Sequence, residues 1–537
     1  MKKLLSSFLM AAAALTANAT DYNTKLSVNA GGGSAEYPNT VVKVIPNGDG
    51  TNNVTIKNVY YKYYTQEMAV GTIVLQNVPV TKAGVFSIMS SVQGIDIQPG
   101  DNEDVSWQGP SYGALCGGQV PAYFNGEVRN GKLYGNLILD TYGAIKRTLK
   151  ITLGDDEYTI GQIPNSGFEA FHDVTVGSVT SKEPHAWHSF MSATGSLVGF
   201  VNTAIHTEVS NDVRPGTKGS SSVLITTGNP IMNQIPNGTI TTGQMSAGAA
   251  SAASTKNNAF LDFSNEALDA NGDPFYATID AKPDAISLWV KFIQGTGDLA
   301  TDYPYATVSA VITDGTKYQD PEPTGDDYKN SNVVAKAQNK TIESKDEWQQ
   351  ITIPFDYDAY IENGADAKAI LVTISTNATP GKGSATDKLY VDDVELVYNA
   401  QLKSISVGGK DLEGFSSGKY YYDKLVANAM VSVDDIEVVA DGQGASVTKS
   451  ISRSDSKPGE ATVTVTVVSA DSKTVNRYTL VFSEPVDGIT SVETKTDLNV
   501  RANKIYTVSG QQVSKMQSGN VYVVKTVDGK TVKVVKK

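Results

Sequence analysis

The stretch Lys388–Tyr398, KLYVDDVELVY, predicts a buried β-strand around which the middle of the chain is organised. Apolar side chains occupy both alternating faces of this strand, and Asp392 and Asp393 interrupt the pattern, one on each face. A carboxylate inside an apolar strand is costly unless it is paired, hydrogen-bonded or bound to a metal. Because adjacent strand residues point to opposite faces, we do not expect the two aspartates to act together on one substrate. The strand should close a domain around a polar network or a cation.

The expected partner of this strand lies far upstream, in NSGFEAF at 165–171, where Glu169 lies between two phenylalanines. The two stretches are predicted to be the two ends of one β-sandwich. Calcium takes six to eight hard oxygen ligands, so Glu169, Asp392 and Asp393 are candidate ligands of a structural Ca²⁺. The alternative is that Asp392 faces solvent at a bulge while Asp393 accepts backbone hydrogen bonds. Of the two aspartates, Asp393 is the one expected to join Glu169 in this site.

Bulk composition limits the classes of function. A chain of 537 residues exceeds one domain, and its net charge of −13 disfavours nucleic acid as a partner, because nucleic-acid binding needs clustered Lys and Arg. The abundance of Gly, Thr, Val, Tyr and Asn is typical of turn-rich β structure. Cys116 is the only cysteine, so no internal disulfide can form.

The N-terminus predicts export. Residues 1–19 have the pattern of a signal peptide, with Lys2 and Lys3, an apolar run at 4–15 and an A-x-A cleavage site at 17–19. No other apolar run reaches the ~20 residues of a transmembrane helix. We therefore expect a protein of the cell surface or outer membrane, or an extracellular protein, with the periplasm as the alternative.

Residues 20–157 predict a small all-β barrel of short antiparallel strands with Asn-Gly turns. The segments GTIVLQNVPVT at 71–81 and FNGEVRNGKLYGNL at 124–137, with the closing LKITLG, resemble the calycin-like β-barrel domain of secreted Bacteroidota proteins. The resemblance implies that an apolar ligand can occupy the barrel. The lining would then include a cluster of tyrosines at 60, 61, 63 and 64; the alternative is that these are half-exposed strand residues and the barrel is filled by its own side chains.

Residues 158–399 contain all four histidines and several strand patterns separated by loops rich in Gly, Pro, Asp and Asn, which predicts a jelly-roll-like sandwich. Several spaced motifs resemble the family named putative carbohydrate metabolism domain. They are IPNSGFEAFH at 163–172, EPHAWHSF at 183–190, NGTITTGQM at 237–245, PDAISLWVKF at 283–292, WQQITIPFDY at 348–357 and STNATPGKGSATDKLYVDDVEL at 375–396. The family name implies a carbohydrate context, and the sandwich is similar to carbohydrate-binding modules.

Two further parts follow. Residues 400–484 contain strictly alternating strands and resemble the cadherin-like β-sandwich, a small Ig-like spacer of bacterial surface proteins. Residues 485–537 form a small all-β tail that resembles the C-terminal sorting domain of type IX secretion, which implies a secretion machinery as partner. From Val486 onward the tail has nine Lys or Arg against four Asp or Glu, and these cations would alternatively protect a sheet edge.

A sugar-binding site needs exposed aromatic rings beside hydrogen-bonding groups. Two tryptophans, Trp289 and Trp348, lie within alternating apolar strands and are predicted to be core residues. The loops of 158–399 supply the candidate carbohydrate-binding residues, which are Trp187, His188, Tyr305, Tyr318 and Asp320. For Trp187, Pro184 in its motif favours an exposed loop, and a core position is the alternative.

The spacing His185-x-x-His188 suits zinc poorly, because no helix and no third ligand accompany it, so a hydrogen-bonding role is expected for His188. The chain has many acids, but none lies in a recognisable signature of a glycosidase, hydrolase or nucleotide-binding protein. We therefore predict an exported, non-catalytic glycan-binding or adhesion protein. A glycan-processing enzyme in 158–399 and binding of a lipid or small apolar ligand by the barrel are the alternatives.

Overall fold

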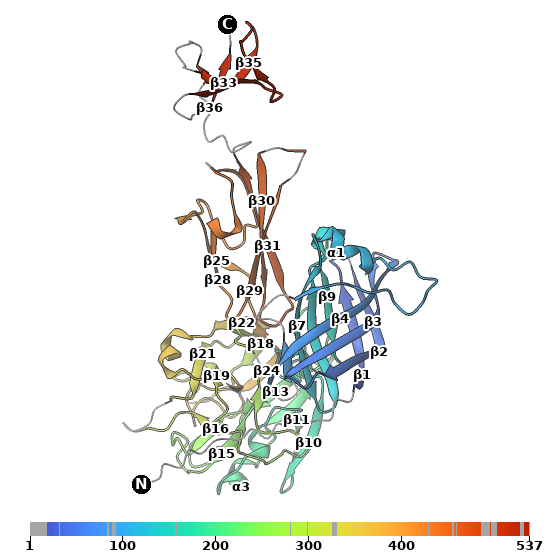
Figure 1. Cartoon of the computed structure of the whole chain (residues 1–537). Helices are drawn as coiled ribbons and strands as arrows, with labels where there is room; N and C mark the ends of the chain where they lie inside the picture. Colours follow the sequence, from blue (N-terminus) through green and yellow to red (C-terminus); the bar gives the residue numbers. More distant parts are fainter. Residues whose placement is uncertain are drawn as a thin grey trace, which may run out of the picture. The chain divides into compact units, whose positions relative to one another are not determined.

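The computed structural model describes residues 19–31, 33–82, 85–87, 93–155, 158–279, 281–297, 299–324, 330–427, 429–453, 456–457, 459–484, 494–495, 502–526 and 531–535. The predicted signal peptide lies outside these residues except for its last position, and the predicted sorting tail lies only partly within them. No described helix is long and apolar enough to cross a membrane. The architecture is all-β and multi-domain, as the sequence predicts (Figure 1).

The first domain is a closed barrel (Figure 1, blue to cyan). Its strands follow the order β5-β4-β3-β2-β1-β9-β8-β7, and β5 pairs with β7 to close the sheet, while β6 extends it beyond β7. The bounds are β1 Thr20–Asn29, β2 Ser34–Pro46, β3 Thr51–Tyr63, β4 Gln66–Lys82, β5 Val85–Ser87, β6 Gln93–Ile95, β7 Val120–Arg129, β8 Lys132–Leu139 and β9 Leu149–Leu153, with short helices η1 Gly109–Ser111, α1 Tyr112–Leu115 and α2 Tyr142–Ile145.

Strand alternation explains how the barrel is filled. Along β2 and β3 the apolar side chains Val42, Val44, Val54 and Ile56 are buried, and they belong to one cluster of inward residues contributed by the strands around the barrel. Tyr61 belongs to the same cluster, while Tyr64 is 73% exposed. The barrel thus packs its own side chains inward, as expected for a barrel of about eight strands.

The central domain is a sandwich of two sheets. The back sheet has the order β12-β13-β24-β18-β22, and the front sheet has the order β14-β23-β19-β21 with β17 paired to β23. The bounds are β12 Thr207–Ser210, β13 Ser222–Thr226, β18 Ala285–Ile293, β22 Gln349–Pro354 and β24 Lys388–Val397 for the back sheet, and β14 Thr239–Thr241, β17 Ala277–Thr278, β19 Ala306–Thr313, β21 Val333–Ile342 and β23 Ala369–Ser375 for the front sheet.

The core of this domain lies between the two sheets. Ile286, Leu288, Val290 and Phe292 alternate along β18 and point inward, where they meet the alternating apolar residues of the front sheet. The remaining elements of the domain are the hairpin β10 Phe171–Val176 with β11 Val179–Pro184, the short helices η2 Phe190–Ser192, α3 Val198–Val201 and η3 Asp358–Asn363, and three strands described next.

A third, smaller sheet covers part of the front sheet from outside. This cap sheet has the order β15-β16-β20, with bounds Gln244–Ala247, Asn257–Leu261 and Tyr318–Asp320. Its side chains Met245, Leu261 and Tyr318 form a second core with Val311 and Leu371 on the outer face of the front sheet. The cap sheet therefore buries one end of that face.

Strand β24 differs from its predicted form. Its pairing with β18 shifts between Ser287 and Trp289, because β24 has one extra residue there, and Asp393 adopts a positive φ of 43°. This β-bulge reverses the alternation, so that Leu389 and Val391 before it and Val394 and Leu396 after it all point into the core. The strand is thus apolar on one face, not on both.

The remaining sheets belong mainly to the second compact unit, which contains residues 401–440, 447–467 and 476–537. One sheet has the order β26-β25-β28 and another β27-β31-β30-β29. Their bounds are β25 Leu402–Val407, β26 Lys410–Asp411, β27 Tyr421–Val426, β28 Ile436–Ala440, β29 Ser446–Arg453, β30 Glu460–Val468 and β31 Val475–Ser483, with η4 Val433–Asp435. In the tail, a five-stranded sheet contains β32 Thr494–Lys495, β33 Ala502–Thr507, β34 Gln512–Val513, β35 Val521–Thr526 and β36 Thr531–Val535.

Candidate functional site

A cavity of about 470 Å³ opens on the outer face of the front sheet, beside the cap sheet. This volume lies within the usual range of ligand pockets, which is about 300–1,000 Å³. The floor of the cavity comes from the front sheet. One wall comes from β15, β16 and the end of β20, and the others come from the region around α3 and from the segments 231–237 and 377–381.

The floor results from a change of chemistry along the strands of the front sheet. In β23 the outward residues Ala369 and Leu371 are apolar where the cap sheet covers them, while Thr373 and Ser375 are polar where the cavity opens. In β19 the same change runs from Val311 to Ser309 and Thr307. The register aligns these polar side chains into two rows across neighbouring strands, which are Thr239, Ser375 and Thr307, and Thr373, Ser309 and Gln338.

A hydrogen-bonded chain fixes part of the floor. The Gln338 amide donates to Ser309 Oγ over 3.1 Å, and Ser309 Oγ donates to Asp320 Oδ2 over 2.6 Å. In the other row, the Thr239 and Ser375 hydroxyls lie 2.8 Å apart. Within the described residues, the Gln338 amide oxygen and the Lys340 ammonium have no hydrogen-bond or ion-pair partner, so both are available to a ligand.

The rim of the cavity is apolar. Phe200 on α3 is 64% exposed and Met232 in the turn 231–234 is 80% exposed, and both line the cavity. Large apolar side chains exposed side by side with a polar floor are characteristic of binding sites. The rim therefore offers a flat ring and a flexible thioether to a ligand whose polar groups meet the floor.

One buried polar atom of the wall has no hydrogen-bond partner in the part of the chain that the structure describes. Asn258 on β16 lines the cavity; its amide donates to the Thr255 carbonyl over 2.8 Å, while its Oδ1 is buried without a hydrogen bond. A buried acceptor without a donor costs about 1–3 kcal/mol.

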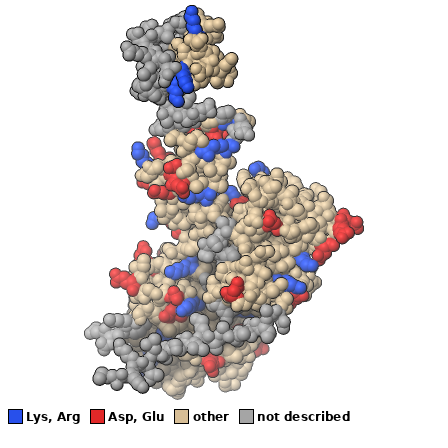
Figure 2. Space-filling model, viewed as in Figure 1, with Lys and Arg blue, Asp and Glu red and all other residues tan. Residues whose placement is uncertain are grey.

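The described lining contains one carboxylate, Asp320, and one cation, Lys340. On the face of the molecule drawn in Figure 2, acidic and basic side chains are interspersed on a largely uncharged surface. The cavity thus offers mainly hydroxyl, amide and apolar groups.

The structure places the five predicted sugar-binding residues differently. Asp320 lines the cavity. Tyr305 is 38% exposed but is not among the lining residues. Trp187, His188 and Tyr318 are almost fully buried, so their rings have no surface for a ligand in this structure.

The motif EPHAWHSF turns inward, and this explains the burial of Trp187. Ala186 has a positive φ of 63°, and its N–H donates to Asp273 Oδ2 over 3.0 Å. The Trp187 indole N–H then donates to the Pro164 carbonyl over 3.1 Å, and its ring packs 5.2 Å from that of Phe168. Trp187 is a core residue of the sandwich.

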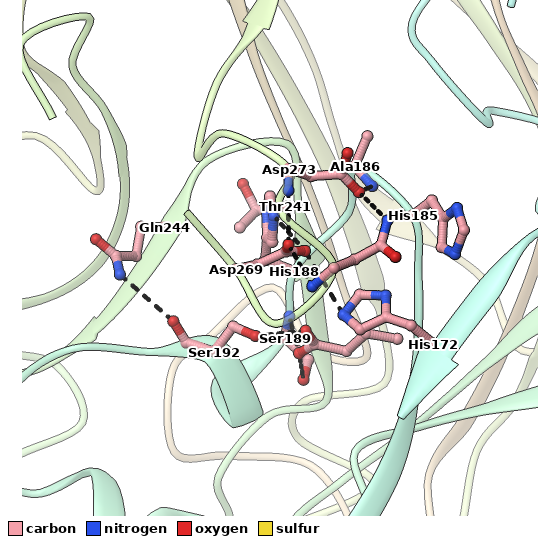
Figure 3. A network of polar contacts seen from close by, with 12 residues as sticks. His172, His185, Ala186, His188, Ser189, Ser192, Thr241, Gln244, Asp269 and Asp273 are labelled. Atoms are coloured by element: carbon pink, nitrogen blue, oxygen red, sulfur yellow. Dashed lines mark hydrogen bonds and ion pairs between the residues drawn. The ribbon is translucent and has the colours of Figure 1, made fainter. Parts of the chain in front are cut away.

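His188 belongs to a buried network around Asp269 (Figure 3). Its Nε2 lies 3.4 Å from Asp269 Oδ2, and His172 Nε2 lies 3.6 Å from the same oxygen, while the ring of His185 points away. The other ring nitrogen of His188 lies 3.0 Å from the Gly243 carbonyl. Burial raises the pKa of Asp269, but the hydrogen bond with His188, the Asp273 N–H and the charges of the two imidazoles outweigh burial and lower it.

The same motif also supports the wall of the cavity. Buried Glu183 accepts from the Ser189 N–H over 2.7 Å and from the hydroxyls of Ser189 and Ser192. These serines flank Phe190, which lines the cavity. Glu183 therefore positions the segment that carries Phe190, and the motif has a structural role behind the wall.

The three predicted metal ligands are held by one loop, residues 211–221. Asp393 Oδ2 accepts from Arg214 Nε over 2.5 Å, and Asp392 Oδ2 accepts from the Arg214 N–H over 3.0 Å. Glu169 accepts from the N–H groups of Ser220 and Ser221 over 3.0–3.2 Å.

Because of the bulge, both aspartates meet Arg214, although simple alternation places them apart. Asp392 is buried, not solvent-facing. In the described part of the chain, no three His, Cys, Asp or Glu side chains are grouped as metal ligands. Burial raises the pKa of Asp392 to about 6, since the backbone N–H groups of Arg214 and Asp393 and the charge of Arg214 compensate only in part and the charge of Asp393 adds repulsion.

Trp289 and Trp348 were predicted to be core residues, but neither lies in the core. Trp289 lies on the outer face of the back sheet, where Arg214 packs over its ring at 5.6 Å. Trp348 is half-buried, and its indole N–H donates to Asp212 Oδ1 over 3.0 Å. The alternation of β18 does indicate this, because Leu288 and Val290 on either side of Trp289 point inward.

The cavity and its lining residues Phe200, Met232 and Gln338 were not predicted from the sequence. The change from apolar to hydroxyl-bearing outward positions along 369–375 is the signal that could have revealed its floor. The rim gives no such signal, because it depends on loops that meet only in the folded chain.

Comparisons with known proteins agree with the two family resemblances. Residues 19–154 match the model of the calycin-like beta-barrel domain, and residues 162–397 match that of the putative carbohydrate metabolism domain. No curated protein matches the chain.

Among solved structures, a putative glycoside hydrolase from Bacteroides vulgatus is 14% identical, with a TM-score of 0.29 over 44% of this chain and 98% of that one. Another putative glycoside hydrolase, from Bacteroides thetaiotaomicron, is 10% identical, with a TM-score of 0.27 over 72% and 98%. A putative outer membrane protein from Bacteroides fragilis is 13% identical, with a TM-score of 0.16 over 68% and 97%. Likeness at this level carries no argument about activity.

Proposed function

We propose, from the carbohydrate-related family that residues 162–397 match, that the cavity on the front sheet binds a neutral saccharide without cleaving it. The observation that carries the proposal is the pairing of a hydroxyl- and amide-rich floor with an exposed apolar rim. A pyranose has the complementary surface, since its hydroxyls form hydrogen bonds at the ring edge and its C–H face packs on an apolar side chain.

The charge of the lining favours binding over hydrolysis. A glycoside hydrolase generally uses two carboxylates on opposite sides of the scissile bond. The described lining supplies Asp320 alone, and Ser309 already donates to it. We also propose that the chain is exported by its N-terminal signal, so that the cavity meets glycans outside the cytoplasm.

The test measures the affinity of the full chain for neutral polysaccharides by native gel electrophoresis, with each polysaccharide cast in the gel. Phe200→Ala removes one apolar wall, and we expect about tenfold weaker binding from the loss of an aromatic contact. Gln338→Ala removes a floor amide, and we expect roughly two- to tenfold weaker binding. Ile361→Ala is the matched control, because Ile361 is 74% exposed and is not among the lining residues.

Two results would overturn the proposal. One is that Phe200→Ala and Gln338→Ala, like the control Ile361→Ala, bind as tightly as the unmodified chain. The other is release of reducing ends that Asp320→Asn abolishes, which would make the domain a glycan-degrading enzyme.

A further inference from the structure

We infer that the N-terminal barrel carries a second saccharide-binding site, a groove on its outer face for a neutral, hydroxyl-rich ligand. The groove has a volume of about 720 Å³. Its lining residues are Asp21, Leu26, Tyr37, Asn39, Thr40, Val41, Lys43, Thr55, Lys57, Asn58, Tyr60, Glu67 and Asp101. The site goes beyond the proposed function of the central domain and does not depend on it.

Strand alternation places this groove outside the barrel. Lys43 on β2 faces Thr55 on β3 in the pairing register, and both line the groove. Their neighbours Val42, Val44, Val54 and Ile56 point into the barrel core. Most of the lining therefore lies on the outer face, while the core residue Leu26 and Tyr37, which packs against the core, form its inner edge.

Two aromatic rings line the groove, and the ring of Trp107 extends their row beyond it. The rings of Tyr37 and Tyr60 lie 6.4 Å apart, and the rings of Tyr60 and Trp107 lie 5.2 Å apart. All three side chains are half-exposed. Tilted rings at successive positions offer apolar faces to consecutive pyranose units, as a row of exposed aromatics does in a binding site for an extended ligand.

A loop between β6 and η1 completes the row. The Asp101 N–H donates to Asn58 Oδ1 over 2.8 Å, and the Gln108 N–H donates to the Ala69 carbonyl over 3.0 Å. Trp107 packs so tightly over Gly100 that a Cβ there would lie 2.2 Å from the indole ring. The position of Trp107 is thus fixed by the fold of the loop.

Both lysines of the groove have a carboxylate neighbour. Lys57 Nζ lies 3.2 Å from Asp101 Oδ1, and Lys43 Nζ lies 3.8 Å from Asp21 Oδ1. The Tyr37 hydroxyl donates a hydrogen bond to Glu67 over 2.7 Å. Burial, the larger cause, and this hydrogen bond both raise the pKa of Tyr37. No lysine of the lining lacks a carboxylate neighbour, so the groove fits uncharged hydroxyl groups better than a phosphate or an acidic sugar.

The test uses the full chain in which the cavity of the central domain is disabled by Phe200→Ala with Gln338→Ala. Its migration is measured in native gels that contain xyloglucan, galactomannan or mixed-linkage β-glucan. We expect retardation in at least one gel, and Tyr60→Ala or Trp107→Ala in this background should raise the dissociation constant about tenfold. Tyr64→Ala is the control, because Tyr64 is 73% exposed on the same barrel but does not line the groove.

Each outcome separates the two sites. If the cavity-disabled chain shows no retardation where the unmodified chain does, the groove proposal is wrong and the cavity stands. If retardation of the unmodified chain is lost with Tyr60→Ala alone and is unaffected by the cavity variants, the groove stands and the cavity proposal is wrong. If the unmodified chain is not retarded in any gel, both are wrong. Because Trp107→Ala can loosen its loop, Tyr60→Ala on strand β3 is the decisive variant.

Discussion

Replacing Asp392 with Asn should stabilise the central domain at neutral pH. Asp392 is 1% exposed, its Oδ1 has no hydrogen-bond partner among the described residues, and its Oδ2 accepts from the Arg214 N–H over 3.0 Å. Burial raises its pKa from an ordinary 3.8 to about 6. The folded state therefore favours the neutral acid, which Asn imitates without a charge.

The magnitude follows from linkage between protonation and folding. A shift of about two units at about 1.4 kcal/mol each makes ionisation of Asp392 cost about 3 kcal/mol in the folded state. Because the folded pKa is raised, this stability is fully present below about pH 4 and is lost as the pH rises through 6. Asp392→Asn should thus be about 3 kcal/mol more stable than the unmodified chain at pH 7–8, and the difference should vanish near pH 4.

The assay is urea unfolding followed by tryptophan fluorescence at pH 4, 6 and 8. Three of the four tryptophans, Trp187, Trp289 and Trp348, lie in the central domain, so the signal reports mainly that domain. Asp393→Asn is the matched control: it removes the carboxylate bound to the Arg214 guanidinium and should give no stabilisation. An Asp392→Asn protein that is no more stable at pH 8, or a gain that is independent of pH, would refute the reasoning.

Three further predictions concern the central domain and the barrel. Glu183→Gln should lower the free energy of unfolding by about 1–3 kcal/mol and weaken saccharide binding, because buried Glu183 holds both serines that flank Phe190; unchanged stability and affinity would contradict this. Burial lowers the pKa of His206 from 6.5 to about 4, so the shift has no effect on stability above pH 7. As the pH falls from 6.5 to 4, the free energy of unfolding of the unmodified chain should fall by about 3 kcal/mol relative to His206→Gln. Parallel pH curves of the two proteins in urea unfolding would argue against this prediction. A fluorescent fatty acid should not enter the barrel, because its inward side chains already pack as one cluster; saturable binding that common lipids displace would favour the apolar-ligand hypothesis instead.

Sequence patterns were sufficient for features that depend on local periodicity and on extended motifs. The all-β architecture follows from alternating strands such as 285–293, and the two family resemblances are confirmed over residues 19–154 and 162–397. These signals are carried by many residues in order along the chain, so a single irregularity does not destroy them.

Features that depend on one residue of backbone geometry or on long-range pairing could not be predicted. The bulge at Asp393 reverses every later side chain of β24, and simple alternation cannot detect it. The turn at Ala186 sends Trp187 into the core, although its proline-containing motif suggests an exposed loop. The cavity combines strands and loops separated by up to about 190 residues in sequence, which no local pattern records.

The most direct test of the central claim is a crystal structure of the full chain soaked with an oligosaccharide of the polysaccharide that it binds. We predict an intact sugar in the cavity of the central domain, with its hydroxyls within hydrogen-bond distance of Gln338 and a C–H face against Phe200. A sugar bound elsewhere in the central domain with the cavity empty, or a cleaved glycosidic bond beside Asp320, would contradict the account.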